Sequence, residues 1–183
     1  MSATDTPRVL SSRIVVFSAV GAALYAVLGL VSFAIPGTQL VAVRPAFALV
    51  PFIGKRFGPI AGFFTGFVGN CMIDQLQGFG FLAFWNWSVA VGLVGAFSAV
   101  LGAKALRHSN EVARIALTAV GALVATAAGL LFVITDMFIQ GISFETFLVG
   151  NYFPALISNG LAVVILVPVL DAVWEPLSRQ AGR

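Results

Sequence analysis

Long apolar segments, separated by short connections rich in glycine, proline or charge, occupy most of this sequence. Hydrophobic residues make up 60% of the chain and charged residues 9%, whereas a typical soluble domain carries about 25% charged residues. So little charge cannot cover a surface in contact with water, but a lipid bilayer accepts an apolar exterior. The sequence therefore predicts an all-α integral membrane protein.

The apolar segments divide the chain into six expected transmembrane helices. Each span needs about 20 residues, so six spans use most of the 183 residues in a single membrane domain, 1–183. The second segment is short and is interrupted by Arg44-Pro45 and Pro51. The expected helices cover about 14–35, 38–54, 59–76, 87–106, 115–139 and 151–173.

Basic residues are distributed unequally between the connections. With the N-terminus on the cytoplasmic side, the cytoplasmic connections and termini hold nine of the ten Lys and Arg residues, and Arg44 is the exception. The outer connections then hold Asp74, Asp136 and Glu145. An excess of positive charge in cytoplasmic loops is the usual signature of membrane orientation. We therefore expect a multi-pass protein with both termini cytoplasmic.

The sequence shows no motif for catalysis, metal binding or nucleotide binding. The only histidine, His108, lies in a cytoplasmic connection, and the only cysteine, Cys71, is too little for a disulfide or a structural zinc site. Metalloprotease, nucleophile-elbow and P-loop patterns do not occur. Basic residues form no stripe that would fit a nucleic acid. We expect no enzyme, no metal and no cofactor; the alternative is an intramembrane hydrolase with Asp74 and Asp136 as a dyad.

Polar and aromatic residues enter the apolar segments mainly from the outer side. Asn70 and Asp74 are four residues apart, and Tyr152 and Asn159 are seven apart, so each pair lies near one helix face. Flat rings with a few directed polar groups suit a planar heteroaromatic ligand. Each feature also has a simpler explanation. The tryptophans could anchor the interface, the amides could join helices, Arg44 could pair with Asp74, and Asp136 could be solvated.

Small residues recur at four-residue spacing along the first segment. Ala19 and Ala23 form one ridge and Ala22 and Ala26 a second, and such ridges let helix backbones approach closely. Either packing inside the bundle or a surface for a partner helix would use them.

Several stretches together give the chain a family resemblance. They are Pro36-Gly37-Thr38-Gln39, Arg44-Pro45, 57–63 (FGPIAGF), 66–70 (GFVGN) and Trp85-Asn86-Trp87-Ser88. With these residues the chain resembles a substrate-binding S component of the energy-coupling factor (ECF) vitamin transporters, in the branch labelled riboflavin-type.

This resemblance implies a function, partners and site residues. It implies a high-affinity subunit of an ECF-type ABC importer in the prokaryotic cytoplasmic membrane. The cargo would be a small water-soluble vitamin or related heteroaromatic micronutrient, with riboflavin or a thiamine precursor as first guesses. The partners would be a membrane coupling (T) subunit and two ATPase subunits. The implied docking residues are Ala19, Ala22, Ala23 and Ala26, and the implied gating loop is Pro36, Gly37, Thr38 and Gln39. The expected ligand-binding residues are Gln39, Arg44, Asn70, Asp74, Trp85, Asn86, Trp87, Asn151, Tyr152 and Asn159.

Two further alternatives stay open at this point. One is a structural or assembly subunit of a membrane complex that binds no ligand. The other is a solitary secondary transporter, although ionisable groups in mid-span, which ion coupling usually needs, are few.

Overall fold

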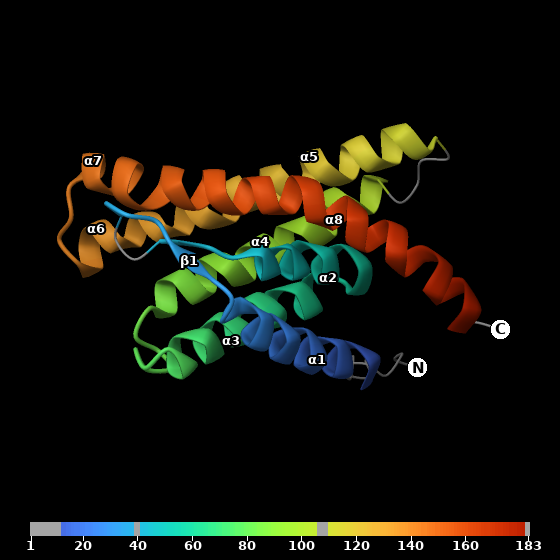
Figure 1. The fold of residues 1–183 in the computed structure, drawn as a ribbon, viewed down its shortest axis with the longest axis horizontal. Helices are drawn as coiled ribbons and strands as arrows, with labels where there is room; N and C mark the ends of the chain where they lie inside the picture. The colour runs from blue at the N-terminus through green and yellow to red at the C-terminus, as the bar shows by residue number, and fades with distance from the viewer. Residues whose placement is uncertain (1–11, 39–40, 106–109, 182–183) are drawn as a thin grey trace, which may run out of the picture.

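The computed structural model describes residues 12–38, 41–105 and 110–181 as an elongated helical bundle (Figure 1). The only strands in these ranges are the two-residue strands β1 (Phe33–Ala34) and β2 (Ala42–Val43), so the described chain is all-α. The long helices are α1 (Ser12–Gly29), α3 (Pro59–Leu76), α4 (Trp85–Ala105), α5 (Glu111–Leu130) and α8 (Phe153–Ala181). The shorter helical elements are η1 (Pro45–Ala48), α2 (Leu49–Phe57), η2 (Leu131–Thr135), α6 (Asp136–Ile139), α7 (Phe144–Thr146) and the π-helical η3 (Phe147–Tyr152).

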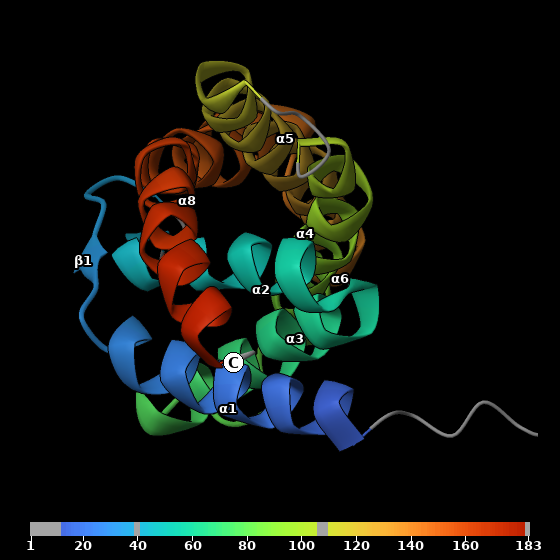
Figure 2. The same ribbon diagram turned by 90° about the vertical axis from the view of Figure 1, so that its right-hand side faces the viewer.

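The short helix α2 lies at the centre of the bundle, and the long helices surround it (Figure 2). Helix α3 packs between α1 and α4, α5 packs on α4, and α8 closes the ring against α5. Residues Val50 to Lys55 of α2 are buried. Both α1 and α8 have their terminal ends at the same end of the bundle (Figure 1).

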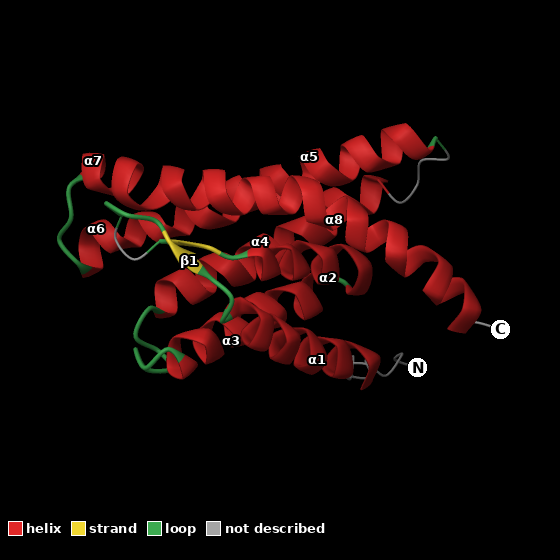
Figure 3. Ribbon diagram, viewed as in Figure 1, coloured by secondary structure: helices red, strands yellow, loops and turns green. Residues whose placement is uncertain are grey.

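The segment between α1 and α2 differs from the expected helices 14–35 and 38–54. Helix α1 ends at Gly29, and β1 and β2 pair antiparallel in a hairpin that crosses one side of the bundle (Figure 3). Arg44 has the extended dihedrals φ −128° and ψ 99°. The residue before a proline avoids the helical region, whereas proline itself fits a first helical turn. Helix therefore begins at Pro45 rather than near residue 38.

The last two expected helices are also interrupted or extended. Continuous α-helix in the fifth segment ends at Leu130, and a 3-10 stretch leads into α6. Asn110 starts α5, because its side chain accepts a hydrogen bond of 3.1 Å from the amide of Ala113. The sixth segment is longer than 151–173 and runs through the π-helical η3 into α8.

Four stretches of the described chain are long and apolar enough to cross a membrane: Ser12–Gly29, Trp85–Ala103, Glu111–Ile139 and Phe144–Gln180. Helix α2 has only nine residues, or about 14 Å of helix. Helix α3 carries Asn70 and Asp74 in its buried face. The six-span count therefore stays a prediction.

Ion pairs join the helices at the end of the bundle where α1 begins and α8 ends. Asp171 of α8 binds both Lys55 and Arg56 of α2, the latter with Nε and Oδ1 2.7 Å apart. Lys55 also donates to Thr118 of α5 at 2.6 Å. Glu175 binds Arg114 and, one turn along α8, Arg179. These contacts tie α2, α5 and α8 together.

Candidate functional site

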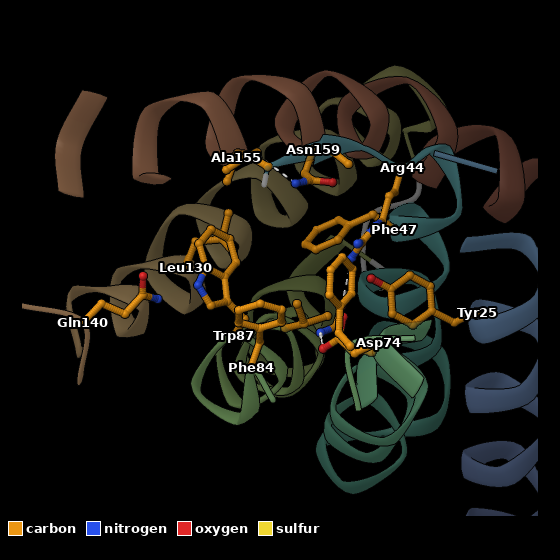
Figure 4. Close-up of a pocket in the computed structure, with 15 residues that line it drawn as sticks. Tyr25, Arg44, Phe47, Asp74, Phe84, Trp87, Leu130, Gln140, Ala155 and Asn159 are labelled. Carbon is orange, nitrogen blue, oxygen red and sulfur yellow. Dashed lines mark hydrogen bonds between the residues drawn. The ribbon is translucent and has the colours of Figure 1, made fainter. Parts of the chain in front are cut away.

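A pocket lies in the other half of the bundle from these ion pairs, and Figure 4 shows the residues that line it. Its walls come from segments that are far apart in the sequence: α1, the hairpin strand β2 with η1, α3, the connection 77–84, α4, the last residue of α5, the residue after α6, and α8. The lining residues are Tyr25, Val41, Ala42, Arg44, Phe47, Asn70, Asp74, Phe79, Phe84, Trp87, Val91, Leu130, Gln140, Ala155 and Asn159.

Aromatic rings form much of the apolar lining. Phe47 lies in η1, Phe79 and Phe84 lie in the connection before α4, and Trp87 lies in the first turn of α4. Phe79 and Phe84 meet edge to face, with ring centroids 5.6 Å apart. Such walls offer flat apolar faces to a ring compound.

A polar network runs along one side of the pocket. Arg44 donates from Nη1 to Oδ1 of Asn70 at 3.2 Å. Asn70 in turn donates from Nδ2 to Ser88 at 3.1 Å and to Asp74 at 3.3 Å. The structure records no direct ion pair between Arg44 and Asp74 in its described ranges. Asn70 therefore bridges the two charged groups and also joins α3 to α4.

Three buried polar atoms in the pocket lining have no hydrogen-bond partner among the described residues. They are the hydroxyl of Tyr25, Nε of Arg44 and Oδ1 of Asn159. Asn159 uses its Nδ2 to donate to the carbonyl of Ala155 at 2.9 Å, which leaves the amide oxygen free. The hydroxyl of Tyr25 points into the pocket (Figure 4). A buried polar group without a partner costs free energy, so these atoms favour a ligand that offers an acceptor to Tyr25 and Arg44 and a donor to Asn159.

The structure brings half of the expected ligand-binding residues into the pocket. Arg44, Asn70, Asp74, Trp87 and Asn159 line it. Trp85 does not and is 45% exposed. Tyr152 does not either, and its hydroxyl donates to the carbonyl of Ala127 at 3.1 Å.

Asn86 and Asn151 lie behind the pocket wall rather than in it. Both donate to the carboxylate of Asp136, which is fully buried. The expectation that Asp136 could be solvated at a helix end is therefore wrong.

The expected gating loop lies at the tip of the hairpin. Pro36, Gly37 and Thr38 form the described part of the turn, and Gln39 lies outside the described residues. Thr38 bonds the carbonyl of Ile35 at 2.7 Å and accepts from the amide of Val41 at 3.2 Å. From the hairpin, Val41 and Ala42 line the pocket.

Tyr25, the phenylalanines and Gln140 were not expected in the site. Tyr25 lies on the face of α1 that is otherwise formed by Gly21, Ala22, Ala26 and Gly29, all buried. A single tyrosine on a stripe of small residues is a signal that the sequence offers. Phe47 and Phe84 carry no such signal, because phenylalanine is common throughout this chain.

The two alanine ridges of α1 have different surroundings. Ala22 and Ala26 are buried inside the bundle, whereas Ala19 and Ala23 are exposed. A Cβ on Gly69 would lie 3.1 Å from the carbonyl oxygen of Ala22, so α1 and α3 approach closely here. The buried ridge is thus used for packing within this chain.

The apolar helices and the pocket between them define a multi-helix membrane protein with a polar and aromatic pocket in one half of the bundle. Residues 9–174 match the family of the ECF-type riboflavin transporter S component. The chain belongs to this family, which confirms the resemblance seen in the sequence.

A curated relative supports the assignment over part of the chain. A UPF0397 protein of Aliivibrio fischeri (strain MJ11) is 38% identical over 86 residues, which are 47% of this chain and 46% of that protein. The matched stretch thus spans about half the length of the relative. No solved structure matches the chain.

Proposed function

We propose that this chain is the high-affinity substrate-binding subunit of an ECF-type ABC importer for a small water-soluble vitamin or related heteroaromatic micronutrient. Riboflavin and a thiamine precursor are the first substrates to test. The observation that carries the proposal is the set of unpaired polar atoms of Tyr25, Arg44 and Asn159 on aromatic walls. A planar ring with polar edges would stack on these walls and pair these atoms.

The charge distribution along the bundle supports the expected orientation. Lys55, Arg56, Arg114 and Arg179 gather at one end, and the pocket opens at the other. Cytoplasmic ends of membrane proteins carry the excess of Lys and Arg. We therefore propose cytoplasmic termini and an outward-facing pocket, in a six-span protein of a prokaryotic cytoplasmic membrane.

The hairpin between α1 and α2 is the proposed gate. Because Val41 and Ala42 form part of the pocket wall, movement of the hairpin would open the site from one side. A two-residue ladder holds the hairpin together, and short ladders of this kind open at low cost. Pro36, Gly37 and Thr38 would then move with this gate.

Transport would depend on partner subunits, because this chain has no ATP-binding motif. The proposed partners are a T subunit and two ATPases, and the exposed ridge of Ala19 and Ala23 is the proposed contact with the T subunit.

We predict that the double variant Ala19→Phe/Ala23→Phe lowers recovery of the coupling module about tenfold in co-purification, because bulky rings separate helices that need close contact. Leu28→Phe, a bulky change at an exposed position of the same helix, is the control. Equal recovery of both variants would place the docking surface elsewhere.

The substrate can be identified from the purified protein. Protein in mild detergent is examined by absorption spectroscopy and mass spectrometry for a co-purified compound, then titrated with riboflavin and a thiamine precursor. We expect a stoichiometric compound that is lost in Trp87→Ala and Asn159→Ala. A folded protein that is empty, binds neither compound and does not associate with a coupling module would instead indicate a structural subunit.

A further inference from the structure

Asp136 holds a buried carboxylate directly behind the pocket wall. Its side chain is 0% exposed and does not line the pocket. Oδ1 accepts from Asn86 at 2.7 Å and from Gln140 at 2.9 Å. Oδ2 accepts from Nε1 of Trp87 at 2.9 Å and from Asn151 at 2.8 Å. Four N–H donors from α4, the end of α6 and η3 therefore converge on one carboxylate.

An anionic carboxylate completes this arrangement. A carboxylate has about four acceptor sites and no donor, and all four are used here. A neutral carboxamide or carboxylic acid would bring a hydrogen toward donors that already point inward. Since the indole of Trp87 is a donor only, that partner cannot turn round to accept.

Two of the four donors, Trp87 and Gln140, are themselves pocket residues (Figure 4). The indole of Trp87 is fixed at its nitrogen, so the bond sets how the ring faces the pocket. If the indole turned over, Nε1 would leave Oδ2 and a buried charge would lose a partner, which is costly.

We propose that Asp136 is a positioning residue that fixes the ring of Trp87 for ligand binding. The inference rests on the proposed function for its effect on affinity, but its structural part does not depend on any ligand. It also explains why an acid is buried at this place without a basic partner in the described chain.

The first test needs no ligand. In protein labelled with ¹⁵N-tryptophan, the Trp87 indole N–H is assigned by its loss in Trp87→Phe. We expect a deshielded resonance with slow hydrogen exchange in the wild type. Asp136→Asn keeps one oxygen but removes the charge, so the resonance should move part of the way toward that of an indole N–H without this hydrogen bond. Asp136→Ala should move it the whole way and speed hydrogen exchange. Glu145→Gln removes an exposed acid of α7 and should change nothing. An unchanged Trp87 resonance in folded Asp136→Asn protein would overturn the proposal.

The second test measures affinity for riboflavin by quenching of flavin fluorescence. Asp136→Asn should weaken binding about tenfold, as expected for a weakened charge-assisted hydrogen bond. In the Trp87→Phe background the same change should have little further effect, because the ring then has no N–H to lose. An equal loss in both backgrounds would show a general structural role and contradict the proposal. A wild type that binds no riboflavin would count against that substrate, while the resonance test would still decide the role of Asp136.

Discussion

Two tyrosines of this chain differ in whether the hydroxyl group has a partner. Tyr25 is fully buried in the pocket lining with its hydroxyl unpaired, whereas Tyr152 lies outside the pocket and bonds the carbonyl of Ala127. A hydroxyl without a partner lowers the free energy of unfolding, and one that is bonded raises it. Substitutions of these two tyrosines are therefore expected to affect different quantities: ligand affinity for Tyr25 and the free energy of unfolding for Tyr152.

We predict that Tyr25→Phe weakens ligand binding by about 1 kcal/mol, or roughly fivefold, without lowering stability. Tyr152→Phe should do the opposite, with about 1 kcal/mol of stability lost and affinity retained. Titration with the co-purified compound and thermal unfolding in detergent measure both quantities. If Tyr152→Phe loses affinity and Tyr25→Phe does not, the pocket described here is not the binding site.

Asp171 is the acid that compensates two bases at the other end of the bundle. Its pairing with Lys55, whose side chain is 3% exposed, is largely shielded from solvent. We predict that Asp171→Asn lowers the free energy of unfolding by about 3 kcal/mol, because it leaves a buried ammonium group without its anion. Glu175→Gln is the matched control and should cost much less, since its partners Arg114 and Arg179 are 29% and 76% exposed and both reach solvent. Similar losses in denaturant titrations of the two variants would contradict this account.

At the scale of elements, glycines allow three helices to approach at backbone distance. Gly54 of α2, Gly62 of α3 and Gly95 of α4 face one another, and a Cβ on Gly95 would overlap the backbone of Gly62. By contrast, a Cβ on Gly121 of α5 would lie 3.7 Å from Leu101, an ordinary contact distance. The central position of α2 depends on the contact among Gly54, Gly62 and Gly95.

We predict that Gly95→Ala destabilises the protein by about 3 kcal/mol, because the helices must move apart. Gly121→Ala should instead be neutral or stabilising by up to about 1 kcal/mol, since alanine favours helix over glycine. Thermal unfolding of both variants in the same detergent compares them directly. A neutral effect of Gly95→Ala would mean that α3 and α4 are not in backbone contact.

At the scale of the whole molecule, the orientation can be tested with single cysteines. The native Cys71 is buried, and Cys71→Ala provides a background without thiols. In this background Glu145→Cys should react with a membrane-impermeant maleimide on intact cells, because the pocket end faces outward. Ser178→Cys, near the end of α8, should react only after the membrane is opened. The reverse pattern would invert the topology, and labelling of both in intact cells would contradict a membrane-spanning bundle.

The class of fold and the family follow from the amino-acid sequence alone. Low charge and long apolar segments require lipid on the outside, and the expected span 59–76 coincides with α3 at Pro59–Leu76. Helical periodicity also placed Asn70 and Asp74 on one face, and both line the pocket. These properties are local, since they depend on composition and on spacings of a few residues.

Which helix faces contact one another follows from the tertiary structure and not from the sequence pattern. Tyr25 and Asn159 lie far apart in the sequence yet line the same pocket, and Asn86, Trp87 and Asn151 converge on Asp136. Periodicity tells which side of a helix is buried, but not which other helix covers it. Asp136 was expected at a solvated helix end because its four donors come partly from distant segments. Their bonds to the carboxylate replace water, and that exchange exists only once the bundle has formed.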